Sequence, residues 1–308
     1  MLEDVLQRRP YNAAAHFVDA NVARGLGDKV AFTDSQRSLT YAQLQASSCQ
    51  LAAALQALDL RAENRVILLF HDTVDHPVAF WGAIRAGIIP VPINTLLTAE
   101  QYHYLFADSR AAAAIVAAAL APTLLSLRHR LPCLRSIIVV GASAKERAEL
   151  RDVLFFEDLL ARAEPTPVTA ATMSDEVAFW MYTSGSTGDP KAVRHVHTSL
   201  MATATLMGQG IIGLREDDVV FSAAKLSFSY GLGNAVSFPM SVGASAVLVP
   251  DRPTPELVFR TLKQHQPTFF FGVPTLYAAM LASSTSTWIS RNRSTSLSPW
   301  TTGALTRL

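Results

Sequence analysis

Short apolar runs that alternate with helix-like segments constrain the fold of this 308-residue chain more than any other feature. The run Val66-Ile67-Leu68-Leu69 is apolar throughout, and Ser136-Ile137-Ile138-Val139-Val140 is apolar after its first residue. Such runs are typical of strands buried on both faces of a parallel sheet. Helical patterns lie between them, and one of these is ended by Gly87. Strands that alternate with helices form doubly wound parallel sheets, so we predict an α/β fold.

The first half of the chain allows several boundaries to be predicted. Strands are expected at 30–32, 65–70, 88–93 and 136–140, and helices after Thr40, at 78–86 and at 100–108. The Ala-rich stretch 111–121 is too short to span a membrane, and we expect it to be a buried helix. Its first part, 112–116, is also compatible with a strand.

A change of pattern divides the chain. Residues 161–174 are small, polar and Pro-containing, which predicts one α/β subdomain at 1–170 and a second at 171–283. In the second we expect strands at 177–182, 219–223, 245–249 and 268–271, and helices at 199–207, 255–264 and 274–282. Residues 284–308 are Ser/Thr-rich and have no acidic residue, which predicts a disordered tail or the result of a reading-frame change.

The charge balance limits the partners that the chain could recognise. The chain has 26 Lys and Arg and 25 Asp and Glu, a net charge of +1. This balance gives no strong positive electrostatic field that would attract nucleic acid or an anionic membrane. The two cysteines, Cys49 and Cys133, are far apart in sequence, and we expect two buried thiols in a reducing compartment. The start, Met1–Val5, does not resemble a targeting sequence, in which basic residues precede an apolar stretch. Together these features predict a cytoplasmic protein without a membrane span.

A loop rich in glycine and hydroxyls carries the clearest chemical signal. Thr183-Ser184-Gly185-Ser186-Thr187-Gly188 follows a predicted strand, and Lys191 follows after Asp189 and Pro190. Glycine allows the close backbone approach and positive φ that a phosphate-holding nest requires. The hydroxyls add hydrogen-bond donors, and Lys191 adds a full positive charge. The segment therefore predicts a polyphosphate clamp.

This loop differs from the P-loop of NTPases. That motif continues from Gly-Lys-Ser/Thr directly into a helix. Here Gly188 precedes Asp189-Pro190, and residues 191–197 alternate as a strand does before any helix begins. We therefore expect a loop between two strands.

The segment Tyr182–Leu200 resembles the nucleotide-loop signature of the adenylate-forming superfamily, which includes acyl- and aryl-CoA ligases, luciferases and adenylation domains. Ser38–Leu44, Trp81–Gly87 and Gly272–Thr275 are also similar to segments of that family, in the same order. One departure is Ala192, where the family usually has Gly, and its methyl group should be tolerated unless φ is positive. The resemblance implies the family's large N-terminal domain, incomplete here, without the small C-terminal domain.

Within the superfamily, the chain most resembles benzoate- and 4-hydroxybenzoate-CoA ligases. Residues 12–19, 225–234 and 237–244 carry this likeness. It implies an acyl pocket that includes Phe228, Ser229, Tyr230, Gly231, Gly272, Val273 and Pro274. Aromatic side chains at 228 and 230 would suit a flat substrate ring. Without the resemblance, core residues beside a turn would be the favoured interpretation of both.

The resemblance also implies a reaction. A carboxylate attacks the α-phosphorus of ATP to give an acyl adenylate, usually with Mg²⁺, and the thiol of CoA then displaces AMP. His197 has two interpretations: it orients groups near the nucleotide, or it is a hydrogen-bonded structural histidine. The family's later base-stacking, ribose-binding and catalytic Lys segments have no match here, so no catalytic residue is identified and no metal ligand is assigned. The alternatives are a ligase for another carboxylic acid or a non-catalytic nucleotide-binding module.

Overall fold

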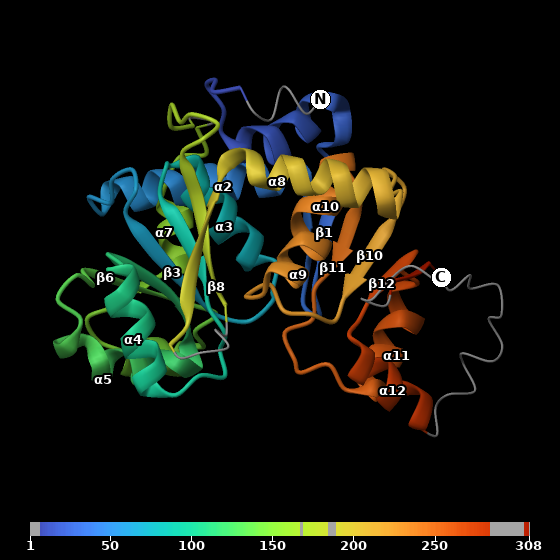
Figure 1. Ribbon diagram of the computed structural model, residues 1–308. Helices are drawn as coiled ribbons and strands as arrows, with labels where there is room; N and C mark the ends of the chain where they lie inside the picture. The colour runs from blue at the N-terminus through green and yellow to red at the C-terminus, as the bar shows by residue number, and fades with distance from the viewer. Residues whose placement is uncertain (1–6, 167–168, 184–188, 284–304, 308) are drawn as a thin grey trace. The chain divides into compact units, whose positions relative to one another are not determined.

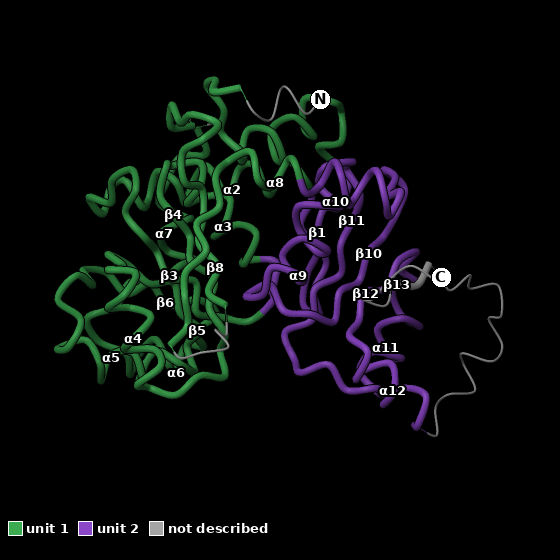
Figure 2. The backbone as a smooth tube through the Cα atoms, in the orientation of Figure 1, with its two compact units in different colours: residues 1–28, 41–71, 75–202 green, residues 29–40, 72–74, 203–308 purple. Residues whose placement is uncertain are grey.

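The computed structural model describes residues 7–166, 169–183, 189–283 and 305–307 (Figure 1). The chain forms two compact units that are interlaced along the sequence (Figure 2). Unit 1 contains residues 1–28, 41–71 and 75–202, and unit 2 contains residues 29–40, 72–74 and 203–308. This division differs from the predicted subdomains 1–170 and 171–283. Two early strands, Val30–Thr33 and Ser38–Thr40, join the sheet of unit 2 by backbone pairing. A later hairpin, residues 177–196, stays in unit 1 because its side chains pack against the core of that unit.

Unit 1 contains a five-stranded parallel sheet in the order β4-β3-β5-β6-β7. Its strands are β3 (Arg65–Leu69), β4 (Ile89–Pro92), β5 (Ala113–Ala117), β6 (Ser136–Val140) and β7 (Leu154–Phe155). Its α-helices are α2 (Tyr41–Ala57), α3 (Asp75–Arg85), α4 (Ala99–Ser109), α5 (Ala121–Leu127), α6 (Ala144–Glu149), α7 (Phe156–Arg162) and most of α8 (His197–Thr203). A two-stranded antiparallel sheet of β8 (Val177–Thr183) and β9 (Lys191–Val196) completes the unit.

The strand order explains why helices cover both faces of this sheet. The chain moves one way from β3 to β4, then crosses β3 to reach β5 and continues in that direction. Since such crossovers are right-handed, the reversal places α3 opposite α4 and α5. Accordingly, Tyr102, Leu105 and Phe106 of α4 and Leu124 of α5 share one buried cluster with alternate residues of β3, β5 and β6. The prediction of a doubly wound α/β fold is therefore confirmed.

Unit 2 contains a six-stranded sheet in the order β13-β12-β10-β11-β1-β2. Its strands are β1 (Val30–Thr33), β2 (Ser38–Thr40), β10 (Val219–Ser222), β11 (Ser245–Val247), β12 (Phe269–Phe271) and β13 (Leu305–Arg307). Its helices are η5 (Ala204–Ile212), α9 (Ser229–Leu232), η6 (Gly233–Ser237), α10 (Phe238–Val242), α11 (Pro255–His265) and α12 (Pro274–Ala282). The four central strands run parallel, and the two edge strands are antiparallel to their neighbours.

The faces of this second sheet are also both covered. Val258, Phe259 and Leu262 of α11 pack with Phe221 and Phe270 of the sheet in one apolar cluster, which α12 joins. The helices η6 and α10 contact strands of the same sheet. The carboxyl ends of β10, β11 and β12 therefore lie at one edge between two helical layers.

Most of the predicted elements are present with small shifts of boundary, and α12 has the predicted bounds. The expectation of a buried helix at 111–121 is wrong, since β5 occupies 113–117 and a short 3₁₀ turn follows. The small side chains fit a central strand that pairs with β3 and β6 and is buried along its whole length. This tertiary pairing outweighs the high helix propensity of Ala.

Two further expectations are corrected. Cys49 is buried, but Cys133 is exposed, because it lies in a turn that precedes β6. Part of the tail is regular, since Leu305–Arg307 forms β13 and pairs antiparallel with Phe269–Phe271. The rest of the predicted tail, residues 284–304 and 308, lies outside the described residues. In the described part of the chain, no helix has both the length and the apolar character needed to cross a membrane.

Candidate functional site

The predicted phosphate clamp joins two antiparallel strands in unit 1. Thr183, the last residue of β8, pairs with Lys191, the first residue of β9, and the Thr183 hydroxyl donates to the Lys191 carbonyl at 3.4 Å. This confirms the expected strand on each side of the loop and distinguishes it from a P-loop that enters a helix. Of the predicted nucleotide-binding residues, Thr183 and Lys191 are described, whereas Ser184, Gly185, Ser186, Thr187 and Gly188 lie outside the described residues.

Helix α4 holds both sides of this hairpin through hydrogen bonds. The Tyr182 hydroxyl, on β8, donates to Asp108 Oδ2 at 2.5 Å. On the other side, the Tyr104 hydroxyl donates to the Pro190 carbonyl at 3.2 Å. Burial and the neighbouring Asp108 carboxylate raise the pKa of Tyr182, so its phenol stays protonated and serves as a donor. No local pattern in the sequence indicated a role for these α4 residues, because only the fold brings 104 and 108 to the loop.

Ala192, which departs from the family pattern, lies within β9 opposite Tyr182. It is not among the residues with positive φ. An extended strand residue accommodates a methyl group without strain. The methyl group of Ala192 is therefore tolerated, because φ at this position is not positive.

His197 lies at the start of α8 and is 1% exposed. Its Nδ1 accepts a hydrogen bond from the backbone N–H of Ala13 at 3.1 Å. Burial lowers the pKa of this imidazole from 6.5 to about 4, so the ring is neutral at pH 7. These contacts favour the structural interpretation of His197 over a role at the nucleotide.

The predicted acyl-pocket residues lie together at the carboxyl ends of two neighbouring strands in unit 2. Strands β10 and β12 pair in parallel and end at Ser222 and Phe271. The first predicted segment, Phe228, Ser229, Tyr230 and Gly231, lies in and just before α9; the second, Gly272, Val273 and Pro274, follows β12 directly. The Tyr230 hydroxyl donates to the Gly272 carbonyl at 3.3 Å and joins the two. The carboxyl end of a parallel sheet is the usual place for a ligand in α/β folds.

The aromatic side chains of the first segment are partly exposed and can contact a ligand. Phe228 is 48% exposed and Tyr230 is 39% exposed within the described residues. A large side chain of the core is normally much less exposed, so these values disfavour the alternative that both are core residues. Burial raises the pKa of Tyr230, and its hydroxyl therefore remains neutral at pH 7.

Two glycines permit the close packing of these segments. A Cβ at Gly231 would lie 2.1 Å from the carbonyl oxygen of Lys225, and a Cβ at Gly272 would lie 2.8 Å from the ring of Tyr277. Any larger residue would displace one of these neighbours. The backbone of each predicted segment is thus fixed by a contact that only glycine allows.

Asp72 and Lys225, for which the sequence predicted no individual role, support the first of these segments. Asp72 is 7% exposed and accepts the backbone N–H of Leu226 on both carboxylate oxygens at 3.3 Å. The Lys225 ammonium lies 3.9 Å from Asp72. One signal was available in the sequence, because Asp72 closely follows an apolar strand and polar residues there often lie at the site end of a sheet.

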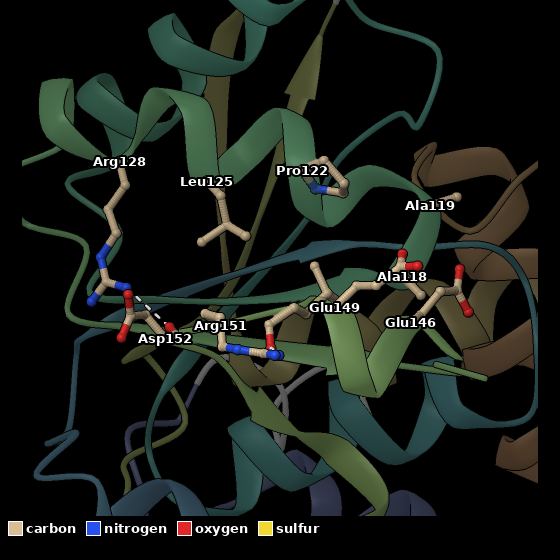
Figure 3. Close-up of a pocket in the computed structure, with 10 residues that line it drawn as sticks. Ala118, Ala119, Pro122, Leu125, Arg128, Glu146, Glu149, Arg151 and Asp152 are labelled. Atoms are coloured by element: carbon tan, nitrogen blue, oxygen red, sulfur yellow. Dashed lines mark hydrogen bonds between the residues drawn. The ribbon is translucent and has the colours of Figure 1, made fainter. Parts of the chain in front are cut away.

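A separate hollow lies in unit 1, with a volume of about 740 Å³ (Figure 3). Its lining includes Pro122 and Leu125 from α5, Glu146 and Glu149 from α6, and Arg128. The Arg128 guanidinium donates to the Asp152 carbonyl at 3.0 Å. None of the predicted site residues lines this hollow. Within the described residues, no group of three or more His, Cys, Asp and Glu is placed to hold a metal ion.

Comparisons with known proteins agree with these features. A family model described as AMP-binding enzyme matches residues 19–304. A 4-hydroxybenzoate–CoA/benzoate–CoA ligase of Rhodopseudomonas palustris is 51% identical over 274 residues, which are 89% of this chain and 50% of that protein. A benzoate–CoA ligase of Thauera aromatica is 43% identical over 273 residues, 88% of this chain and 50% of that protein.

Experimental structures of related enzymes have the same fold. A benzoate CoA ligase from Burkholderia xenovorans LB400 is 41% identical, with a TM-score of 0.80 over 89% of this chain and 53% of that chain. The anthranilate CoA ligase AuaEII, in complex with anthranoyl-AMP, is 34% identical, with a TM-score of 0.86 over 90% of this chain and 52% of that chain. The chain therefore spans about half the length of the relatives it matches.

Proposed function

Because the chain belongs to the AMP-binding enzyme family, we propose that it takes part in the ATP-dependent activation of an aromatic carboxylic acid of the benzoate class. The hydrogen bond between Tyr230 and Gly272 carries this proposal. It joins two segments of the expected acyl pocket and leaves Phe228 and Tyr230 exposed beside them. The two benzoate–CoA ligases that are 51% and 43% identical support the choice of substrate class.

In the proposed reaction, a carboxylate oxygen attacks the α-phosphorus of ATP. The bond between the α-phosphorus and the bridging oxygen breaks, and pyrophosphate leaves with that oxygen. The thiol of CoA then attacks the acyl carbon, the thiol proton is released, and AMP departs as the thioester forms. Negative charge accumulates on phosphoryl oxygens in the first step, so positive and hydrogen-bonding groups placed there stabilise it.

The roles that we propose for individual residues follow from this chemistry. Lys191 and Thr183 hold the β- and γ-phosphates of ATP together with the loop between them. Phe228 and Tyr230 contact the flat face of the acid, while Gly231 and Gly272 keep the backbone close. We propose that Mg²⁺ accompanies ATP, since this ion is commonly bound by one or two protein oxygens and by substrate phosphates.

The chain spans about half the length of the relatives above. The resemblance assigns base stacking, ribose binding and a catalytic Lys to family segments other than those matched here. We propose that this chain, a cytoplasmic ligase by descent, supplies the sites for ATP and the acid, and that thioester formation also requires those other segments. The alternatives are activation of a different carboxylic acid and nucleotide binding without catalysis.

Calorimetric titration of the 308-residue chain with ATP, benzoate and hexanoate tests this proposal. We expect benzoate to bind more tightly than hexanoate, and Phe228→His to reduce that preference at least threefold because ring contact is replaced by a polar group. Equal affinities for the two acids would support a different substrate, and ATP binding without acid binding would support a nucleotide-binding module. A pyrophosphate-exchange signal with benzoate would show that these residues catalyse adenylate formation without the other segments of the family.

A further inference from the structure

The side chain of Lys225 is fully engaged with backbone oxygens of unit 2. Its ammonium donates to the carbonyls of Val249 at 2.5 Å, Pro250 at 3.2 Å and Asp251 at 2.6 Å. These three carbonyls follow β11, at the carboxyl end of the parallel sheet. A lysine ammonium has three donors, so none remains for a substrate carboxylate. Lys225 is therefore placed to hold structure and not to bind the acid.

Asp72 holds the same turn from another segment of the chain. It accepts the N–H of Leu226 and lies 3.9 Å from the Lys225 ammonium, where the opposite charges attract each other. The short segment that carries Asp72 is itself fixed, because the N–H of Val74 donates to Asp34 at 2.9 Å. The turn that begins at Lys225 is thus attached both to the end of β11 and to the segment 72–74.

The turn leads directly into the expected aromatic wall of the acyl pocket. The N–H of Phe228 donates to the carbonyl of Lys225 at 3.0 Å, and the backbone of Gly231 packs against that same oxygen. A displacement of Lys225 would therefore move Phe228 and, through Gly231, the adjacent Tyr230. The contacts form one path from the ammonium to the two aromatic rings.

We propose that Lys225 and Asp72 are positioning residues that set the orientation of Phe228 and Tyr230, and with it the preference for a flat aromatic acid. This inference rests on the proposed function and extends it to residues that do not touch the substrate. Removal of either charge should loosen the turn at 224–231 and leave the β8–β9 hairpin of unit 1 unchanged.

Hydrogen–deuterium exchange of the 308-residue chain tests the positioning directly. In Lys225→Met we expect the amides of Leu226 and Phe228 to exchange at least tenfold faster than in the unchanged chain, while amides of β5 and β6 exchange at the same rate. Lys225→Arg, which keeps the positive charge, should restore most of the protection. The matched control is Lys263→Met, which changes an exposed lysine of α11 in the same unit and should leave the turn protected.

Calorimetry on the same proteins tests the consequence for binding. We expect Lys225→Met to weaken benzoate binding at least fivefold without changing the affinity for ATP. Asp72→Asn, which keeps the shape and one acceptor oxygen for Leu226, should give a smaller effect in the same direction, and it serves as the second variant if Lys225→Met does not fold. Failure of the unchanged chain to bind benzoate would refute the proposed function, while the exchange rates would still decide the positioning.

Two results would overturn the positioning role. One is unchanged exchange at Leu226 and Phe228 in both Lys225→Met and Asp72→Asn. The other is faster exchange throughout both units, with equal losses of benzoate and ATP affinity, since that would show a general contribution to stability.

Discussion

At the scale of single residues, burial determines which ionisable side chains carry charge. Burial raises the pKa of Asp72 from 3.8 to about 6, even though Lys225 and the Leu226 N–H oppose the shift. Burial also lowers the pKa of His197 to about 4 and that of His76 to about 3. The interior therefore favours the neutral forms of these groups.

The first residue-scale prediction concerns His197 and acid stability. Its folded pKa lies below its unfolded value of 6.5, so its contribution to stability is present above pH 6.5 and is lost as the pH falls to about 4. The loss should be roughly 3 kcal/mol, at about 1.4 kcal/mol per pH unit. In His197→Asn, the free energy of unfolding, measured with denaturant between pH 4 and 7, should change less with pH than in the unchanged chain. The exposed His129 provides the control, and an equal effect of His129→Asn would contradict this reasoning.

The second residue-scale prediction concerns Lys191, which begins β9 at the predicted clamp. Lys191→Ala removes a charge-assisted phosphate contact worth about 1.5–3 kcal/mol. ATP affinity should fall at least tenfold in a calorimetric titration. An unchanged affinity would remove Lys191 from the proposed site. Arg194→Ala, on the same exposed strand, is the control for a general loss of positive charge.

At the scale of elements, α4 connects the fold of unit 1 to the β8–β9 hairpin. A capping box of Thr98 and Gln101 fixes the start of this helix. From its last turns, Tyr104 and Asp108 reach the two sides of the hairpin. The helix therefore both covers the sheet and fixes the two strands that flank the proposed clamp.

We predict that loss of these contacts weakens nucleotide binding although neither residue belongs to the loop. Tyr182→Phe removes the hydrogen bond to Asp108, which is worth about 1.5–3 kcal/mol because its acceptor is charged. ATP affinity should fall about threefold to tenfold, since part of this energy holds the hairpin in place. Tyr11→Phe is the control, because the buried Tyr11 hydroxyl has no hydrogen-bond partner among the described residues. Equal effects of the two substitutions would show that α4 does not support the hairpin.

At the scale of the whole molecule, the units are assembled from segments that are distant in sequence. Strands β1 and β2, near the start of the chain, pair within the sheet of unit 2. At the other side of that sheet, β13 covers the free edge of β12. The backbone of Phe269–Phe271 is therefore hydrogen-bonded on both sides, to β10 and to β13.

The pairing of β13 leads to a prediction about aggregation. A chain that ends at Ala304 lacks this strand and exposes the backbone of Phe269–Phe271, and such an edge can pair with other molecules. Light scattering during incubation at 37 °C should therefore rise faster for the shortened chain than for the 308-residue chain. A chain that ends at Ser283 should behave in the same way, since it lacks the same strand. Equal scattering from the full and shortened chains would show that β13 does not protect the edge.

The sequence by itself determined the type of most elements and predicted the chemistry of the loop. Apolar runs such as 65–70 and 136–140 predicted buried strands, because burial on both faces leaves no polar position. The Gly-rich segment that ends at Lys191 predicted a strand on each side. These signals are local, and neighbouring residues alone produce them.

Only the tertiary structure decided which distant segments come together. The Ala-rich composition of 111–121 led to the wrong prediction of a helix, because pairing with β3 and β6 makes its first half a strand. The sheet of unit 2 recruits β1 from an early part of the chain, and the contacts of Asp72 with Leu226 join residues 154 positions apart. Backbone pairing and burial of charge depend on partners that are near in space, and no local pattern of residues specifies them.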